Sequence, residues 1–141
     1  MWTCPDCQRR FGKARQGHDC APAMTLEEYF ATGPDFERPV YEAVQAHLDV
    51  LGEGDDAVYV EPVSVGLFCK HGTRTFLQLR PMTKWVAVSF TLARRLEHPR
   101  LARKVQSQGG SHYHVVNVRS PDEVDALLCG WITEAYEAAE R

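Results

Sequence analysis

Three cysteines and one histidine near the start of the chain form its clearest potential metal-binding pattern. Cys4 and Cys7 are separated by two residues, and His18 and Cys20 follow after ten more. Three thiolates and one imidazole are a ligand set that suits tetrahedral Zn²⁺. So short a segment buries too little surface to fold unaided, so the metal would supply its stability. The pattern therefore predicts one structural zinc ion held by Cys4, Cys7, His18 and Cys20.

Two other interpretations of these residues remain open. One residue separates His18 from Cys20, whereas common zinc fingers leave roughly two to five, although an extended strand would still place both side chains on one face. Cys4 and Cys7 could instead be a redox pair, but such a pair normally opens a helix after a strand, and little chain precedes Cys4. The cysteines could also be surface residues without a ligand.

The other thiols and imidazoles do not form a recognisable catalytic motif. The sequence has no glycine-rich phosphate loop, nucleophile elbow or two-histidine metalloprotease helix. Cys69 could pair with His71 or His114, but its place on the apolar face of a predicted strand favours a buried, inert thiol. His112 and His114 share one side of a strand, where local hydrogen bonding is the simpler interpretation. We assign no catalytic residue, which favours a non-enzymatic role without deciding the question.

Basic residues are concentrated in the second half of the chain. The net charge is −3, yet residues 70–119 contain ten basic side chains and a single acid, Glu97. A basic surface attracts phosphate-bearing ligands, and each phosphate contact releases counterions. Solubility, or attraction between acidic helices and a basic sheet, would also explain this partition. The candidates for contacts with nucleic acid or another polyanion are Arg74, Arg80, Lys84, Arg94, Arg95, Arg103 and Lys104, with Trp85 and Tyr113 as stacking aromatics.

Apolar periodicity predicts the elements that position these residues. Thr25 and Glu28 have the spacing of a capping box, which predicts a helix from Leu26, and a second helix should run from about residue 38 or 39 to Gly52. Alternation predicts strands within 57–72, 73–81 and 84–92 and at about 112–118. A helical turn is expected at 101–105. Phe76, Trp85 and Tyr113 fall out of phase with the apolar positions, so they could line an open sheet face.

A last helix is predicted to begin after Ser120. Ser120 would be its N-cap, Pro121 its first residue, and Glu123 would complete a capping box. Its apolar stripe should lie on the sheet; the stripe consists of Val124, Leu127, Leu128, Trp131, Ile132, Ala135 and Tyr136. The predicted fold class is α+β, an antiparallel β-meander packed by N-terminal helices and a long C-terminal helix, preceded by a small zinc-binding knuckle.

Length and composition set outer limits on the interpretation. The 141 residues and 16.0 kDa suit one domain with a small appendage, which we divide into a knuckle at 1–22 and an α+β domain at 23–141. No apolar run approaches the roughly 20 residues that span a bilayer, and the N-terminus lacks the order of a signal peptide. We therefore expect a cytoplasmic protein with reduced thiols and no membrane partner.

Three stretches carry a resemblance to a known family. "VGLFCKHGTRTFLQLRP", "WVAVSFTLARRLEHPRLARKV" and "HVVNVRSPDEVDALLCGWITEAYE" resemble the bacterial family catalogued as domain of unknown function 5655, over about residues 24–136. The N-terminal cysteine pattern is similar to an extension of some actinobacterial-type members. The resemblance implies a nucleic-acid or defence context, because related domains are fused to nuclease- or helicase-like modules, and the layout looks like the double-wing DNA-binding fold. It implies no catalytic residues.

These observations favour non-catalytic binding of nucleic acid or another polyanion through the basic sheet face and the 93–111 loop. A second hypothesis is a protein-interaction module that docks through the zinc knuckle. A third is an uncharacterised enzyme or small-anion binder in which His71, His112 and His114 converge.

Overall fold

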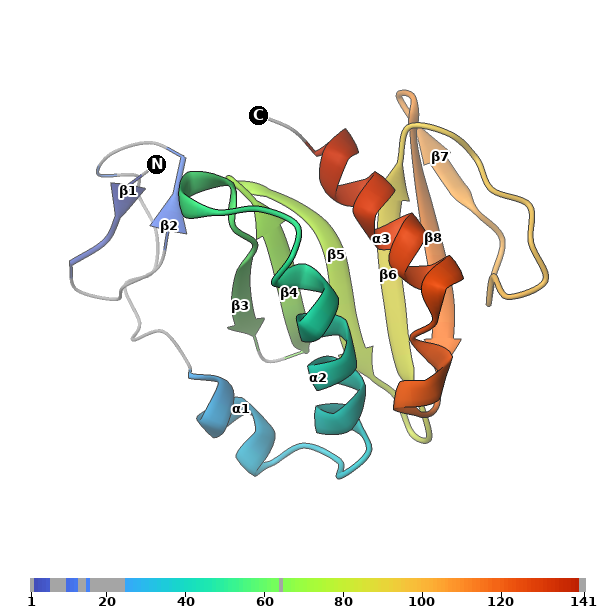
Figure 1. Cartoon of the computed structure of the whole chain (residues 1–141), viewed down its shortest axis with the longest axis horizontal. Coiled ribbons are helices and arrows are strands. Elements are labelled where there is room, and N and C mark those ends of the chain that lie inside the picture. The colour runs from blue at the N-terminus through green and yellow to red at the C-terminus, as the bar shows by residue number, and fades with distance from the viewer. Residues whose placement is uncertain (1, 6–9, 13–14, 16–24, 64, 140–141) are drawn as a thin grey trace.

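The protein is a six-stranded antiparallel sheet with helices across one face (Figure 1). The computed structural model describes residues 2–5, 10–12, 15, 25–63 and 65–139. Cys7, His18 and Cys20 lie outside the described residues. The main strands, in the order β3-β4-β5-β6-β8-β7 across the sheet, are β3 (Tyr59–Val63), β4 (Gly66–His71), β5 (Arg74–Pro81), β6 (Val86–Leu92), β8 (Ser111–Val118) and β7 (Gln106–Gln108).

The described helices are α1 (Leu26–Ala31), α2 (Glu37–Leu48) and α3 (Ala126–Ala138), with short 3₁₀ turns η1 (Gly54–Asp56) and η2 (Pro121–Glu123). A separate two-stranded ladder joins β1 (Trp2–Thr3) to β2 (Arg10–Phe11). Helices α2 and α3 lie side by side across the sheet (Figure 1). This arrangement confirms the predicted α+β fold class, and Thr25 and Glu28 form the predicted capping box of α1.

The core fills the space between the sheet and helices α2 and α3. Every second residue of β6 faces this core, from Val86 to Leu92, and Leu77 and Leu79 do the same from β5, each at most 1% exposed. The helices contribute Val40, Val44, Leu48, Leu128 and Ile132. The predicted apolar positions of β5 and β6 therefore face the core, as the alternation of side chains along a strand requires. Ala87 and Ser89, on the other face of β6, are also buried.

Two predictions for the strands are wrong. The stretch 57–72 is not one strand but a hairpin, since Val63 pairs with Gly66 where the chain reverses, and Val65 is exposed. Phe76 does not line the open face but is buried, in edge-to-face contact with Tyr136. A register shift opposite Cys69 and Lys70 leaves one extra residue in β5. Such a bulge re-aims a side chain, so Phe76 joins Leu77 in the core.

The segment after β6 is extended rather than helical, contrary to the turn expected at 101–105. Leu101 forms a bridge with Val116, and the Ala102 N–H donates to the Val115 carbonyl at 2.7 Å. Strand β7 then pairs with the start of β8. Gly109 and Gly110 join the two strands with φ values of 56° and 84°, which glycine adopts without strain. Residues 101–108 thus form the outer edge of the sheet, beside β8.

Helix α3 begins later than predicted. Ser120 has no capping hydrogen bond, and Pro121–Glu123 form the 3₁₀ turn η2 instead. Asp125 is the N-cap, and its carboxylate accepts a hydrogen bond from the Leu128 N–H at 3.0 Å. This later start turns Leu127 outward, where it is 41% exposed, while Leu128, Trp131, Ile132, Ala135 and Tyr136 are buried as predicted.

The two candidate caps can be distinguished by substitution. Asp125→Ala should lower the free energy of unfolding by about 1 kcal/mol or more, because it leaves a helix N–H unsatisfied and also removes the carboxylate that accepts from Arg100. Ser120→Ala is the matched control and should change it by less than about 0.5 kcal/mol. Urea denaturation of both variants measures the difference, and equal losses would restore Ser120 as the cap.

Glu37 is a buried carboxyl group at the start of α2. It is 1% exposed and accepts a hydrogen bond from the Tyr29 hydroxyl, which ties α1 to α2. Its Oε1 atom has no hydrogen-bond partner among the described residues. Burial raises the pKa of Glu37, against the opposing effect of the Tyr29 hydrogen bond. The charged form is therefore costly in the fold.

Replacing this carboxyl group should produce a pH-dependent gain in stability. The folded protein binds the Glu37 proton more tightly than the unfolded chain does. This proton binding stabilises the fold fully at a pH below the pKa of Glu37 in the unfolded chain, and the stabilisation is lost as the pH rises through the pKa of Glu37 in the folded protein. Glu37→Gln should therefore raise Tm at pH 8, and the gain should shrink towards pH 4. Glu42→Gln, exposed on the same helix, is the control. A gain that is constant with pH would contradict this account.

Candidate nucleic-acid interface

One face of the sheet has no helix packed on it among the described residues. The alternation that buries Val88 and Phe90 directs their neighbours Ser89 and Thr91 to the opposite face. The strand register places Gln78 beside Ser89 and Tyr113 beside Thr91. Gln106 pairs with Tyr113 in the next strand. This helix-free face therefore carries side chains from four strands in adjacent positions.

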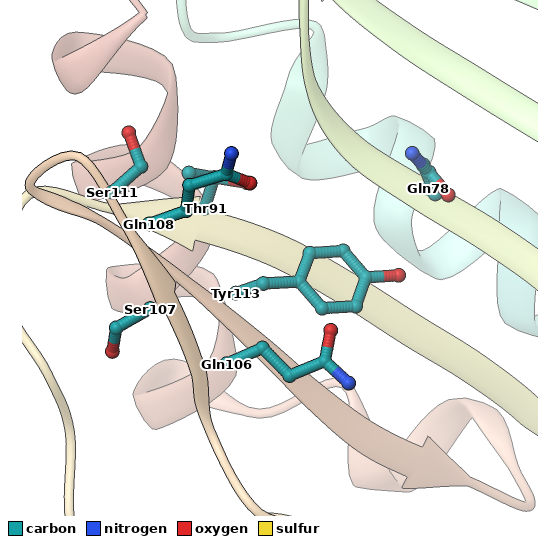
Figure 2. Close-up of a pocket in the computed structure, with 7 residues that line it drawn as sticks. All are labelled: Gln78, Thr91, Gln106, Ser107, Gln108, Ser111 and Tyr113. Atoms are coloured by element: carbon teal, nitrogen blue, oxygen red, sulfur yellow. The ribbon is translucent and has the colours of Figure 1, made fainter.

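A hollow of about 650 Å³ lies on this face near β7 (Figure 2). In Figure 2 the Tyr113 ring and the Gln106 side chain project in the same direction, and Gln78 lies apart from them on β5. Seven residues line the hollow: Gln78, Thr91, Gln106, Ser107, Gln108, Ser111 and Tyr113. All seven side chains can form hydrogen bonds, and none carries a charge at neutral pH.

The hydrogen-bonding side chains around the hollow mostly form no hydrogen bond with other described residues. Ser107 contacts His112 Nδ1 through its hydroxyl at 2.7 Å. The other six lining side chains form no hydrogen bond with the part of the chain that the structure describes. The hollow therefore presents donors and acceptors that water or a ligand can satisfy. It is an arrangement suited to a neutral, polar ligand.

The predicted cationic residues are not gathered into one patch. Arg80 and Lys84 lie near the β5–β6 turn, where Arg119 also stacks on Trp85 at 5.1 Å. Arg74 begins β5 and Arg95 follows β6, so antiparallel pairing places both at the opposite end of the sheet. Arg103 and Lys104 project from the outer edge, just before Gln106. The basic residues thus surround the helix-free face rather than cover it.

Arg94 is paired with the helical layer. Its Nε and Nη2 atoms donate to the two carboxylate oxygens of Glu134 on α3, at 2.8 and 2.9 Å. These hydrogen bonds raise the pKa of Arg94 and lower the pKa of Glu134. The bidentate geometry is the strong form of this contact. Arg94 therefore anchors the segment after β6 to α3 and is a poorer candidate for phosphate contact than sequence suggests.

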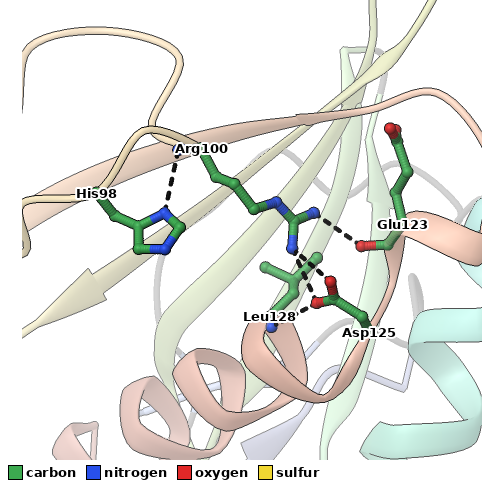
Figure 3. A network of polar contacts seen from close by, with 5 residues as sticks. All are labelled: His98, Arg100, Glu123, Asp125 and Leu128. Atoms are coloured by element: carbon green, nitrogen blue, oxygen red, sulfur yellow. Dashed lines mark hydrogen bonds and ion pairs between the residues drawn. The ribbon is translucent and has the colours of Figure 1, made fainter.

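Arg100 forms a second anchor (Figure 3). Its Nη1 donates to both carboxylate oxygens of Asp125 at 2.8 and 2.9 Å, and its Nη2 donates to the Glu123 carbonyl at 2.8 Å. The hydrogen bond from Leu128 and the Arg100 contact both lower the pKa of Asp125. In contrast, Arg95, Arg103 and Lys104 are exposed and form no ion pair with a described residue. These three cations remain available to a ligand.

The three histidines of the small-anion hypothesis do not converge. His71 on β4 is buried against Tyr136, with its Nδ1 3.0 Å from the Tyr136 carbonyl. His114 on β8 is buried against Phe90, and its Nε2 accepts from the Leu96 N–H at 3.0 Å. Burial lowers the pKa of His114. His112 lies on β8 with His114, and two strands separate β8 from β4, so His71 does not approach the other two histidines.

The cysteines of the main domain are not poised for nucleophilic chemistry. Cys69 has no exposed surface, and burial raises its pKa to about 12. Burial also raises the pKa of Cys129. A thiol becomes an effective nucleophile only as a thiolate. Both residues therefore stay protonated at neutral pH, as the prediction of a buried, inert Cys69 requires.

Only one of the four predicted zinc ligands lies among the described residues. Cys4 is 3% exposed, and it directly follows β1, which pairs with β2 through Trp2 with Phe11 and Thr3 with Arg10. No group of three or more potential ligands occurs within the described ranges. The zinc site thus stays a prediction, because Cys7, His18 and Cys20 fall outside those ranges.

Sequence reasoning found Tyr113 but missed most of the hollow. Gln78, Thr91, Gln106, Gln108 and Ser111 are uncharged, so a search for clustered cations passes over them. The available signal was their phase: Gln78 and Thr91 alternate with buried residues just as Tyr113 does. The glutamines of β7 carried no such signal, because residues 106–108 were not expected to form a strand.

Comparison with known proteins places the chain in a family without an assigned role. None of the helices in the described part of the chain is long and apolar enough to span a bilayer. Searches among curated proteins and among solved structures found no match. The family model described as "Domain of unknown function (DUF5655)" matches residues 26–139. The match begins at α1 and ends just past α3, so the chain belongs to the DUF5655 family.

Proposed function

We propose that this protein binds single-stranded nucleic acid without catalysing a reaction. The observation that supports this most is the position of Arg103 and Lys104, two exposed cations at the sheet edge that lead directly into the strand beside Tyr113. Cations that follow a phosphate backbone, next to an aromatic side chain on a sheet, are the usual parts of a single-strand binding surface.

The charge distribution supports the same proposal. Part of the basic excess is used internally, since Arg94 and Arg100 pair with acids on or beside α3. Arg95, Arg103 and Lys104 have no such partners among the described residues. Attraction between the two layers therefore does not account for the whole basic excess. The remaining cations lie at the end and the outer edge of the helix-free face, where they can contact phosphates that flank it.

Charge reversal at the sheet edge tests this proposal. Arg103→Glu should weaken binding of a fluorescein-labelled 20-nucleotide DNA single strand, measured by anisotropy, and should do so for any sequence. Each lost phosphate contact should also make the dependence of log Kd on log salt shallower by about 0.7. Arg38→Glu changes the net charge equally on the helical side, where Arg38 pairs with Glu27.

The control separates a local contact from a general effect of charge. The Arg38 variant should keep the wild-type affinity within about twofold, apart from the small long-range effect of charge. Equal losses in both variants would show that net charge alone drives binding. Affinity of the wild type that does not respond to salt would contradict the proposal and favour a protein-interaction module.

We also propose that the N-terminal segment holds one structural zinc ion through Cys4, Cys7, His18 and Cys20. Burial of Cys4 and the β1–β2 pairing around it support this, because a knuckle needs its two thiols enclosed by a reversing chain. Bound to these residues, the ion would cross-link a segment that has little core of its own.

Metal analysis of the untagged protein tests the zinc proposal. One equivalent of zinc per chain is expected by mass spectrometry, and Cys4→Ser should reduce it strongly. Cys129→Ser is the matched control and should leave the zinc content unchanged, because Cys129 lies on α3. Protein that contains no metal after purification without chelators would refute the proposal and reopen the redox interpretation of Cys4 and Cys7.

A further inference from the structure

We propose that the hollow on the helix-free face binds a single nucleobase, stacked on Tyr113 and hydrogen-bonded by surrounding amides. This inference rests on the proposed function and deepens it, because it assigns the recognition of bases to one site. The hollow has a volume of about 650 Å³, which is in the range of small-molecule sites.

Unused hydrogen-bonding capacity is the first argument. Gln78, Gln106 and Gln108 each carry an amide with two N–H donors and a carbonyl acceptor. None of them forms a side-chain hydrogen bond with a described residue. The exposed edges of nucleobases present the same alternation of donors and acceptors, and single-stranded bases are read along these edges. The glutamines therefore offer the chemistry that an unpaired base requires.

The position of Tyr113 is the second argument. It lies in the register between Thr91 on β6 and Gln106 on β7, so strand pairing on both sides holds its backbone. The ring projects along the hollow with the Gln106 amide beside it (Figure 2). Aromatic side chains on a sheet support stacked bases, each worth roughly 1–3 kcal/mol. A ring placed among free amides thus combines stacking with recognition of the base edge.

The absence of charge around the hollow selects the class of ligand. Its lining contains no lysine, arginine, aspartate or glutamate, so it does not suit a phosphate or another small anion. Arg103 and Lys104 stand outside it, in the same edge segment as Gln106. A neutral base with a phosphate attached matches this division between an uncharged hollow and a cationic rim.

Free nucleosides test this site without a contribution from phosphate. Adenosine, guanosine, cytidine and uridine would each be titrated into ¹⁵N-labelled protein at 50 and 300 mM salt. At least one should cause saturable shifts of the Gln78 and Gln106 side-chain amides, with the same Kd at both salt concentrations. Tyr113→Ala should abolish the shifts, whereas Tyr113→Phe should retain them, because a phenyl ring still stacks.

The outcomes separate this inference from the proposed function. Loss of about tenfold or more in single-strand affinity is expected for Tyr113→Ala, with an unchanged melting temperature as evidence of folding. Wild-type affinity for DNA in that variant, or no saturable shift with any nucleoside, would overturn the base site and leave phosphate contact by the rim intact. Saturable binding of glucose or maltose alone would identify a carbohydrate site and overturn the inference. Nucleoside binding without polymer binding would instead sustain the site and refute the proposed function.

Discussion

The alternation of side chains along β6 is the constraint on which both faces of the molecule depend. This strand pairs with β5 on one side and β8 on the other. Its even-numbered residues, Val86 to Leu92, enter the core beneath α3. Ser89 and Thr91 must then face the opposite side, together with their register partners Gln78 and Tyr113. The same periodicity that secures the core therefore assembles the hollow.

Regular elements with one buried face could be predicted from sequence because their signals are local. The capping box at Thr25 and the alternation of β6 follow from residue spacing alone. Departures from regularity could not be predicted in this way. Phe76 reaches the core because β5 contains one extra residue, a bulge, opposite Cys69 and Lys70 of β4. Asp125 replaces Ser120 as the cap because η2 lies between Ser120 and α3. Serine and aspartate are both favoured N-caps, so residue type alone does not distinguish the two positions.

The candidate site shows the same limit. Tyr113 could be found from its phase within a strand. The glutamines of β7 reach the site only because β7 pairs with β8, and no apolar alternation in residues 106–108 predicts that pairing. The count of charged residues located a basic region, but it could not show which cations form ion pairs with acids of the same chain. Among the described residues, the contacts of Arg94 with Glu134, of Arg100 with Asp125 and of Lys70 with Glu61 show which cations are already paired. Attraction between the helical layer and the sheet therefore accounts for Arg94 and Arg100 but not for the unpaired cations Arg95, Arg103 and Lys104 among the described residues.

The glycine turn between β7 and β8 determines which side chains of β7 face the hollow, although neither glycine lines it. Gly109 and Gly110 set the register that pairs Gln106 with Tyr113. Because side chains alternate between faces, a turn longer or shorter by one residue would direct Ser107 inward and turn both glutamines of β7 outward. Relatives could thus acquire a different pattern of donors and acceptors through the length of this turn, while every strand residue stayed the same.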